Sequence, residues 1–143
     1  NTDHRILHEY KSTFLNTFLH GTHDDDFLIR SSAYANLGEL CKALGSSLSS
    51  EIILQIMNEV EYCIENEKSL EVKRASILLC TQLLIGLQAN KDETDKKMGL
   101  LVLKPCLAPL LRSLKVSYEN NSDEILKLHA QLAIEELDNI IKD

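Results

Sequence analysis

Hydrophobic residues recur every three to four positions along most of this chain, the spacing that gathers them on one face of an α-helix. Short polar segments rich in Asp, Ser, Asn or Gly interrupt the pattern and mark helix ends. The pattern predicts six helices, at about residues 3–20, from the 24–26 aspartates to 44, 51–65, 70–87, 98–118, and from the 120–123 cap segment to 141. The fourth is apolar nearly all round, which predicts burial on more than one side.

Three of these helices share a motif: an aliphatic residue, a basic residue and then a small residue. The copies are Ile29, Arg30 and Ala33; Val72, Lys73 and Ala75; and Leu126, Lys127 and Ala130. The first two copies lie 43 positions apart, and the same shift places Leu37, Leu40, Cys41 and Leu44 on apolar residues. A period of roughly 40–47 residues is typical of HEAT and armadillo repeats, which are stacked helical hairpins.

The repeat predicts an all-α fold, an α-solenoid of HEAT or armadillo type with six helices in three antiparallel pairs. Leu40, Leu83 and Leu137 are expected at equivalent core positions. The third copy arrives 54 positions after the second, so eleven extra residues must be accommodated. The polar run 88–97 is the predicted place, as a loop between helices.

Local signals refine the helix ends. Gly45 is expected to end the second helix. Pro105 and Pro109 are expected to kink or split the fifth, because proline removes a backbone donor. Asp24, Asp25 and Asp26 are read as N-caps rather than as a calcium loop, since no glycine and terminal glutamate follow at the required spacing.

Composition fits one helical domain spanning residues 1–143, with 44% hydrophobic residues and no Trp. The net charge of −7 disfavours nucleic acid and anionic membrane surfaces as partners. The longest apolar run, 75–87, is shorter than the ~20 residues of a membrane span, and the first ten residues do not resemble a signal peptide. We expect a soluble C-terminal fragment of a longer solenoid that contacts upstream repeats of its own chain.

The four cysteines, Cys41, Cys63, Cys80 and Cys106, are far apart and fall on apolar helical positions. Zinc sites and disulfide frameworks need clustered or paired thiols. The spacing therefore predicts buried structural thiols in a reducing compartment.

Candidate chemistry is sparse. His4 and His8 are one helical turn apart, and His20 and His23 follow, so a metal-dependent hydrolase that uses these histidines is an alternative hypothesis. No HExxH motif is present and no carboxylate or cysteine completes a tetrahedral set, so surface histidines are the preferred interpretation. His129 is interpreted as a packed helical residue. The sequence predicts no catalytic residue, metal or cofactor.

Acidic residues gather in and beside the third helix, at Glu51, Glu59, Glu61, Glu65 and Glu67. Glu61 and Glu65 form a like-charge pair. Two readings remain open: a solvated face partly neutralised by Lys73 and Arg74, or a ridge in which Glu59, Tyr62 and Glu65 contact a basic or amphipathic segment of a protein client. Glu135, Glu136 and Asp138 form the next acidic group and are further candidates.

Three blocks of sequence carry a resemblance: RSSAYANLGELC at 30–41, EVKRASILLCTQLLIGL at 71–87 and KLHAQLAIEELDNII at 127–141. Together they resemble the C-terminal region of the family of transport and Golgi organization protein 6. The resemblance implies a solenoid without catalytic residues, cytoplasmic or associated with Golgi membranes through partners, that acts in secretory-pathway and Golgi organisation. A related fungal branch implies RNA polymerase II assembly and nuclear import. A purely structural solenoid cap is the remaining alternative.

Overall fold

The computed structural model describes residues 2–89 and 92–142, and all regular structure in these ranges is helical. Its elements are α1 (Thr2–Gly21), α2 (Phe27–Leu44), the 3-10 turn η1 (Gly45–Ser47), α3 (Ser50–Asn66), α4 (Leu70–Gln88), α5 (Glu93–Asn120) and α6 (Glu124–Lys142). The predicted all-helical fold with six helices is confirmed for the described residues.

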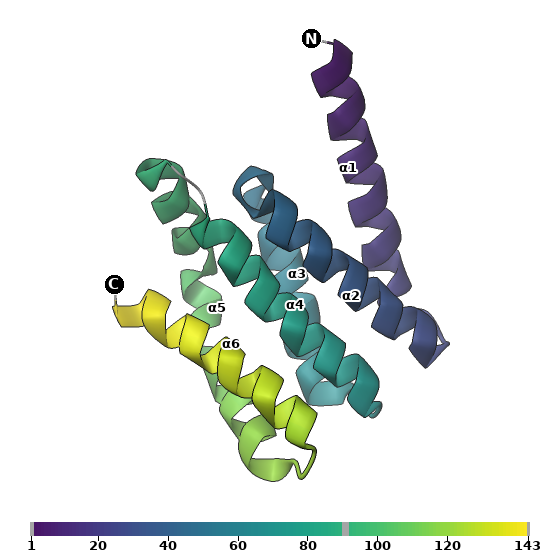
Figure 1. Cartoon of the computed structure of the whole chain (residues 1–143), viewed down its shortest axis with the longest axis vertical. Coiled ribbons are helices and arrows are strands. Elements are labelled where there is room, and N and C mark those ends of the chain that lie inside the picture. The colour runs from purple at the N-terminus through teal and green to yellow at the C-terminus, as the bar shows by residue number, and fades with distance from the viewer. Residues whose placement is uncertain (1, 90–91, 143) are drawn as a thin grey trace.

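The helices form two layers (Figure 1). α2, α4 and α6 lie side by side and run in the same direction, while α3 and α5 pack behind them. α1 packs against α2 and then diverges from the rest of the molecule toward its N-terminal end. Each helix of the first layer contacts the helix that precedes it in the chain, α1 with α2, α3 with α4 and α5 with α6. One hydrophobic core runs between the layers.

The central helix α4 is the most enclosed. It contacts α2 and α6 within its layer and α3 and α5 behind it. Because neighbours cover three of its sides, Ile77, Leu79, Cys80, Leu83 and Leu84 have no exposed surface. The prediction that this helix is buried on more than one side is confirmed.

The repeat register agrees with burial at most positions. Leu83 and Leu137 are fully buried as predicted, but their equivalent Leu40 is only partly buried. The reason is the position of α2, which has α4 on one side while α1 diverges from the other. Ser76, rather than Ala75, is the fully buried small residue 43 positions after Ala33.

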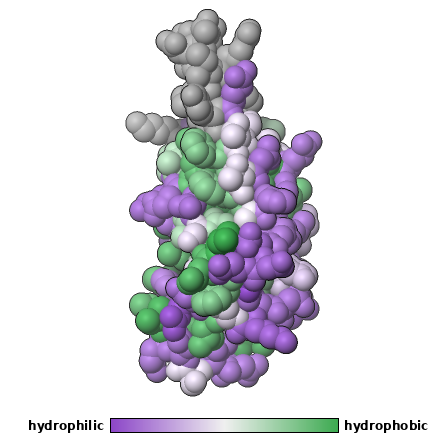
Figure 2. Space-filling view, turned by 90° about the vertical axis from the view of Figure 1, so that its right-hand side faces the viewer, coloured by the Kyte–Doolittle hydropathy of each residue, from purple (hydrophilic) through white to green (hydrophobic). Residues whose placement is uncertain are grey.

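The start of α2 departs further from its repeats. Ile29 is 46% exposed, whereas its equivalents Val72 and Leu126 are fully buried. Phe27 and Leu28 are exposed as well. Figure 2 views the molecule from the side where α2 begins, and there a band of hydrophobic side chains runs between hydrophilic ones. This edge of the molecule is therefore of mixed polarity.

The eleven extra residues of the third copy are not a loop, so that prediction is wrong. α4 continues to Gln88 and α5 begins at Glu93. α5 has 28 residues and its counterpart α3 has 17, so α5 is longer by the length of the insertion. The prolines do not split α5, since Pro105 and Pro109 both lie inside one continuous helix. The polar residues extend a helix because an exposed helical turn tolerates polar side chains on all faces.

Side chains cap the helices where the sequence indicated. Leu28 donates its backbone N–H to Asp26 at 2.9 Å, and Leu126 donates to Asp123 at 2.8 Å. Ser49 and Ser69 cap α3 and α4 in the same way. Gly45 ends α2 in a right-handed conformation, so its lack of a side chain serves another purpose. A Cβ atom there would overlap with the backbone of Gly86 in α4.

The cysteines are free thiols, and Cys41, Cys63 and Cys80 are buried as predicted, while Cys106 is only partly buried. Burial raises the pKa of both Cys41 and Cys80 to about 12. Within the described ranges, no helix has the length and apolar character needed to cross a membrane.

Candidate functional site

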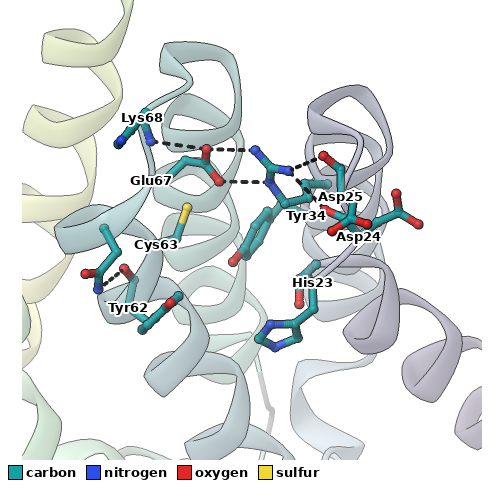
Figure 3. A pocket seen from close by; sticks show the side chains of 11 residues that line it. His23, Asp24, Asp25, Tyr34, Tyr62, Cys63, Glu67 and Lys68 are labelled. Carbon is teal, nitrogen blue, oxygen red and sulfur yellow. Dashed lines mark hydrogen bonds and ion pairs between the residues drawn. The ribbon is translucent and has the colours of Figure 1, made fainter.

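A polar cavity of about 410 Å³ lies between the turn that joins α1 to α2 and the C-terminal half of α3. We call it the Tyr62 cavity. Figure 3 shows Tyr62 on α3 and His23 on the turn, on either side of Tyr34. The residues that shape it include His23, Asp25, Arg30, Tyr34, Tyr62 and Glu67.

Hydrogen bonds to its own backbone hold the turn between α1 and α2. Thr22 is buried and donates its hydroxyl to the carbonyl oxygen of Leu19 at 2.6 Å. Arg30 donates from one terminal nitrogen to the carbonyl oxygens of Asp24 and Asp25, both at 3.0 Å. The turn is thereby tied to the first turn of α2, and the Asp25 carboxylate is left exposed at the rim.

The same guanidinium reaches across to the next helical hairpin. Arg30 Nε donates to Glu67 Oε2 and a terminal nitrogen donates to Oε1, both at 2.9 Å. Glu67 Oε1 also accepts the backbone N–H groups of Lys68 and Ser69. The hydrogen bond from Arg30 is the main cause of a lowered pKa at Glu67. This bidentate pair fixes the turn between α3 and α4 against α2.

A second contact joins the turn to α3. His23 Nε2 lies 2.7 Å from Glu59 Oε1, with the histidine side chain 58% exposed and the glutamate side chain 19% exposed. Tyr34 lies behind this pair, and its hydroxyl donates to the carbonyl oxygen of Glu59 at 3.5 Å. Burial raises the pKa of Tyr34 strongly, so the phenol stays protonated.

Tyr62 differs from these neighbours because it is 60% exposed. Its backbone carbonyl accepts a hydrogen bond from the Asn66 side chain, while the ring stands at the mouth of the cavity. An exposed aromatic ring in a cavity that carboxylates also line suits cationic side chains, which bind to the ring face and to the carboxylates.

The structure divides the candidates predicted on α3. Glu59 and Tyr62 lie toward the Tyr62 cavity, whereas Glu65 lies toward α5 and accepts a hydrogen bond from Ser113 at 3.4 Å. Arg74 does not neutralise this helix, because it pairs with Asp123 at the start of α6. The base that neutralises Glu67 is Arg30.

The second acidic group lies on α6. Glu136 accepts a hydrogen bond from Gln88 at 3.0 Å, which ties α6 to the end of α4. Glu135 is exposed and accepts from Gln131 at 3.3 Å. Asp138 is partly buried. Of the three, Glu135 is the most accessible to a partner.

The alternative metal site gains no support from the described residues, among which no three His, Cys, Asp or Glu side chains are grouped to hold an ion. The side chains of His4 and His8 lie outside the described part. His20 is exposed, and His23 is paired with Glu59. His129 is partly buried on α6, and burial, with a smaller effect of Arg74, lowers its pKa.

Arg30 was not predicted as a site residue, and His23 was named only among the histidines of the alternative metal site. The sequence held one signal for Arg30, because a cation in the first turn of a helix opposes the helix dipole and calls for a carboxylate partner. The identity of that partner, 37 residues away in the sequence, depends on the tertiary fold.

Comparison with known proteins confirms the resemblance noted in the sequence. The chain is 27% identical over 128 residues to Transport and Golgi organization protein 6 of Drosophila melanogaster. The aligned region covers 87% of this chain and 12% of that relative, so the chain corresponds to a small part of it. No protein-family model and no solved structure matches the chain.

Proposed function

We propose that this chain is a segment of a HEAT- or armadillo-type solenoid that acts as a non-catalytic protein-interaction module. Three observations support the proposal: two layers of helices, parallel helices 43 and 54 residues apart in one layer, and a core that continues from one hairpin to the next. Such stacks present extended surfaces made of side chains from successive repeats.

The client contact is placed at the Tyr62 cavity. The observation that carries this proposal is the exposed Tyr62 ring on one wall of a cavity whose other wall carries the exposed Asp25 carboxylate, while Arg30 and Glu67 are paired with each other. One cationic side chain of a basic or amphipathic client segment stacks on Tyr62, and another pairs with Asp25. Glu59 contributes by holding the turn through His23.

The cellular role follows from the relative rather than from the cavity. A relative named for transport and Golgi organisation favours a role for this chain in the secretory pathway, in the cytoplasm and at Golgi membranes through partner proteins. RNA polymerase II assembly stays a prediction of the sequence resemblance alone.

The test compares three forms of the chain in affinity capture from cytosol followed by mass spectrometry. Asp25→Asn combined with Tyr62→Ala should abolish recovery of the proteins captured by the wild type. Glu51→Gln removes another exposed carboxylate, at the far end of α3, and should leave recovery unchanged. Capture by the wild type should also fall as salt rises, because screening weakens exposed charge pairs.

The alternative reading predicts a different outcome. If the chain is purely a structural solenoid cap, the double variant and the wild type recover the same proteins in low salt. A stoichiometric transition metal in the purified chain would instead favour the hydrolase hypothesis, and it would be found by elemental analysis.

A further inference from the structure

A second cavity, of about 400 Å³, lies on the opposite flank of α3, where α3 ends, α4 begins and the C-terminal half of α5 passes. We call it the Arg112 cavity. We propose that it binds an anionic side chain of a protein partner, a phosphorylated serine or threonine next to an apolar residue. The residues that carry this proposal are Glu65, Lys73, Arg112, Ser117, Val116 and Asn121.

Two basic side chains at the cavity have no carboxylate partner in the described ranges. Lys73 and Arg112 line the cavity, and neither forms an ion pair with any residue in the described ranges. Arg30 and Arg74, in comparable places beside interhelical turns, each pair with a carboxylate. Most lysines in the described ranges also lack an ion pair, so the relevant feature is that two such cations line one cavity. Guanidinium and ammonium groups together are the usual ligands of phosphate oxygens.

Neutral donors complete the wall. Ser113 and Ser117 are four residues apart on α5 and therefore lie on the same face. Ser117 is 8% exposed, so a hydroxyl is available inside the cavity rather than on open surface. Asn120 and Asn121 line the cavity as well. Hydroxyl and amide donors can satisfy the phosphate oxygens that the cations leave free.

Glu65 is the carboxylate of this wall, and it accepts the Ser113 hydroxyl at 3.4 Å. With Glu65 included, the cavity has two positive charges and one negative charge. A doubly charged phosphate is therefore attracted to it more strongly than a singly charged carboxylate. Glu65 also gives the proposal a directional test, since removal of its charge should strengthen anion binding.

Apolar surface at the cavity favours a peptide over a free anion. Val116 is 50% exposed and Ile64 lies beside it in the wall, so an apolar side chain next to the phosphate has a place to pack. An anionic membrane is disfavoured because the net charge of −7 repels such a surface outside this one cavity.

The probe is the dipeptide acetyl-leucyl-phosphoserine amide, titrated into the 15N-labelled chain by NMR. Backbone amides of Ser113, Ser117 and Asn121 should shift together and saturate. Inorganic phosphate should bind at the same amides at least about fivefold more weakly, and the unphosphorylated dipeptide should cause no saturable shift. Equal affinity for inorganic phosphate would overturn the peptide assignment, and shifts confined to other regions would overturn the site.

Variants give the decisive comparison. Arg112→Gln should weaken binding of the phosphodipeptide by about tenfold or more, the loss expected for a charge-assisted phosphate contact. Lys115→Gln removes an exposed charge three residues away, outside the cavity, and should change the affinity by less than about twofold. Glu65→Gln should strengthen it. If Arg112→Gln and Lys115→Gln weaken binding of the phosphodipeptide equally, the effect is a non-specific electrostatic attraction to positive charge, and the proposal is overturned.

Two further controls separate this proposal from others. Arg112 is exposed, so circular dichroism should find the fold and melting temperature of its Gln variant unchanged. Asp25→Asn with Tyr62→Ala should leave phosphodipeptide binding intact, because those residues lie on the other flank of α3. The chain should not co-sediment with phosphatidylcholine vesicles that contain phosphatidylserine. If it does bind these vesicles, and if Arg112→Gln abolishes that binding, the cavity is a site for a lipid headgroup and the peptide proposal is overturned.

Discussion

The central helix α4 packs against two equivalent neighbours in different ways. Toward α2, the contact is made at Gly38, Gly45 and Gly86, where Cβ atoms would overlap with the facing helix. The repeat register gives the corresponding positions at the α4–α6 contact. A shift of 43 places Gly38 on Thr81 and Gly45 on Gln88, and a shift of 54 places Gly86 on Ile140. Larger side chains occupy all three of these positions, and the α4–α6 contact is less extensive than the α2–α4 contact.

The difference shows that a repeated hydrophobic pattern does not fix the spacing between repeats. The α2–α4 contact, the most extensive between two described helices, depends on backbone proximity. Polar side chains bridge both contacts, Gln82 to Glu39 at 3.2 Å toward α2. Toward α6, Gln88 is bonded to Glu136, and Arg74 Nε is bonded to Asp123 at 3.1 Å, where no glycine replaces a larger side chain. The first contact should therefore tolerate added volume poorly, and the second should respond to changes of polarity.

The largest loss of stability is expected where both contacts share the core. Leu83 is fully buried in α4, so Leu83→Ala should lower the free energy of unfolding by about 2–5 kcal/mol through loss of contacts and a residual cavity. Leu48, which follows η1, is only partly buried. Leu48→Ala should therefore lower the free energy of unfolding by less. Thermal melts of both variants provide the measurement, and equal melting temperatures would contradict the order of burial.

Gly86→Ala tests the close α2–α4 contact directly. The added methyl group would overlap with the carbonyl oxygen of Cys41, which belongs to the backbone and cannot rotate away. We expect a loss of about 1–3 kcal/mol, as for overpacking of a core. Faster reaction of the Cys41 thiol with a thiol reagent should accompany the loss, because the two helices must separate.

Gly99→Ala is the matched control for Gly86→Ala. A Cβ atom at Gly99 in α5 would lie 3.4 Å from a methyl group of Leu87, which is an ordinary contact. Alanine is the better helix former by about 1 kcal/mol, so this variant should be neutral or more stable. A loss as large as that of Gly86→Ala would show that close approach of the backbones is not the cause.

Thr81→Val tests the polarity of the α4–α6 contact, to which the repeat register assigns Thr81. The Thr81 hydroxyl is buried and has no hydrogen-bond partner among the described residues. Replacing it by a methyl group of similar size should raise the free energy of unfolding by about 1 kcal/mol. The same substitution at Thr22, whose hydroxyl donates to Leu19, should lower it by about 1 kcal/mol. Denaturant unfolding of the two variants should therefore shift in opposite directions.

Much of this fold is predictable because its signals are local. Ser69 and Asp26 cap helices through contacts within three residues, and the apolar face of α4 is continuous in the sequence. The polar run at 93–97 was misread because polarity alone cannot distinguish an exposed helical turn from a loop. The spacing between α2 and α4 was not predicted, since glycines in a helix signal close approach without naming the neighbour.

The candidate site was predictable only in part, and for a geometric reason. Glu59, Tyr62 and Glu65 follow at steps of three residues on α3, so at about 100° per residue each lies about 60° from the next, and Glu65 lies about 120° from Glu59. Helical geometry alone could have separated Glu59 from Glu65, but it could not have decided on which side Tyr62 lies. The pairing of Arg30 with Glu67 could not be derived in this way, because it needs the relative placement of two hairpins.

The smallest expected effect concerns the ion pairs that tie successive hairpins together. Arg30 lowers the pKa of Glu67, and Arg74 lowers the pKa of Asp123. A carboxylate with a lowered pKa in the folded state contributes stability above its ordinary pKa, about 4.3 for Glu, and this contribution is lost as the pH falls through the lowered value. Stability should therefore decline in this acidic window.

Arg30→Gln separates the pair from the general effect of acid. It should cost about 1 kcal/mol at pH 7, near the upper end for ion pairs with partial exposure, and progressively less as the pH falls through the lowered pKa of Glu67. Arg112→Gln removes a cation that has no carboxylate partner in the described ranges, so it should leave the slope of stability against pH unchanged. Urea unfolding at pH 7, 5, 4 and 3 measures both slopes. A constant cost of Arg30→Gln across this range would mean that Arg30 acts through its bonds to the carbonyls of Asp24 and Asp25, and the link between hairpins would then lie in apolar packing alone.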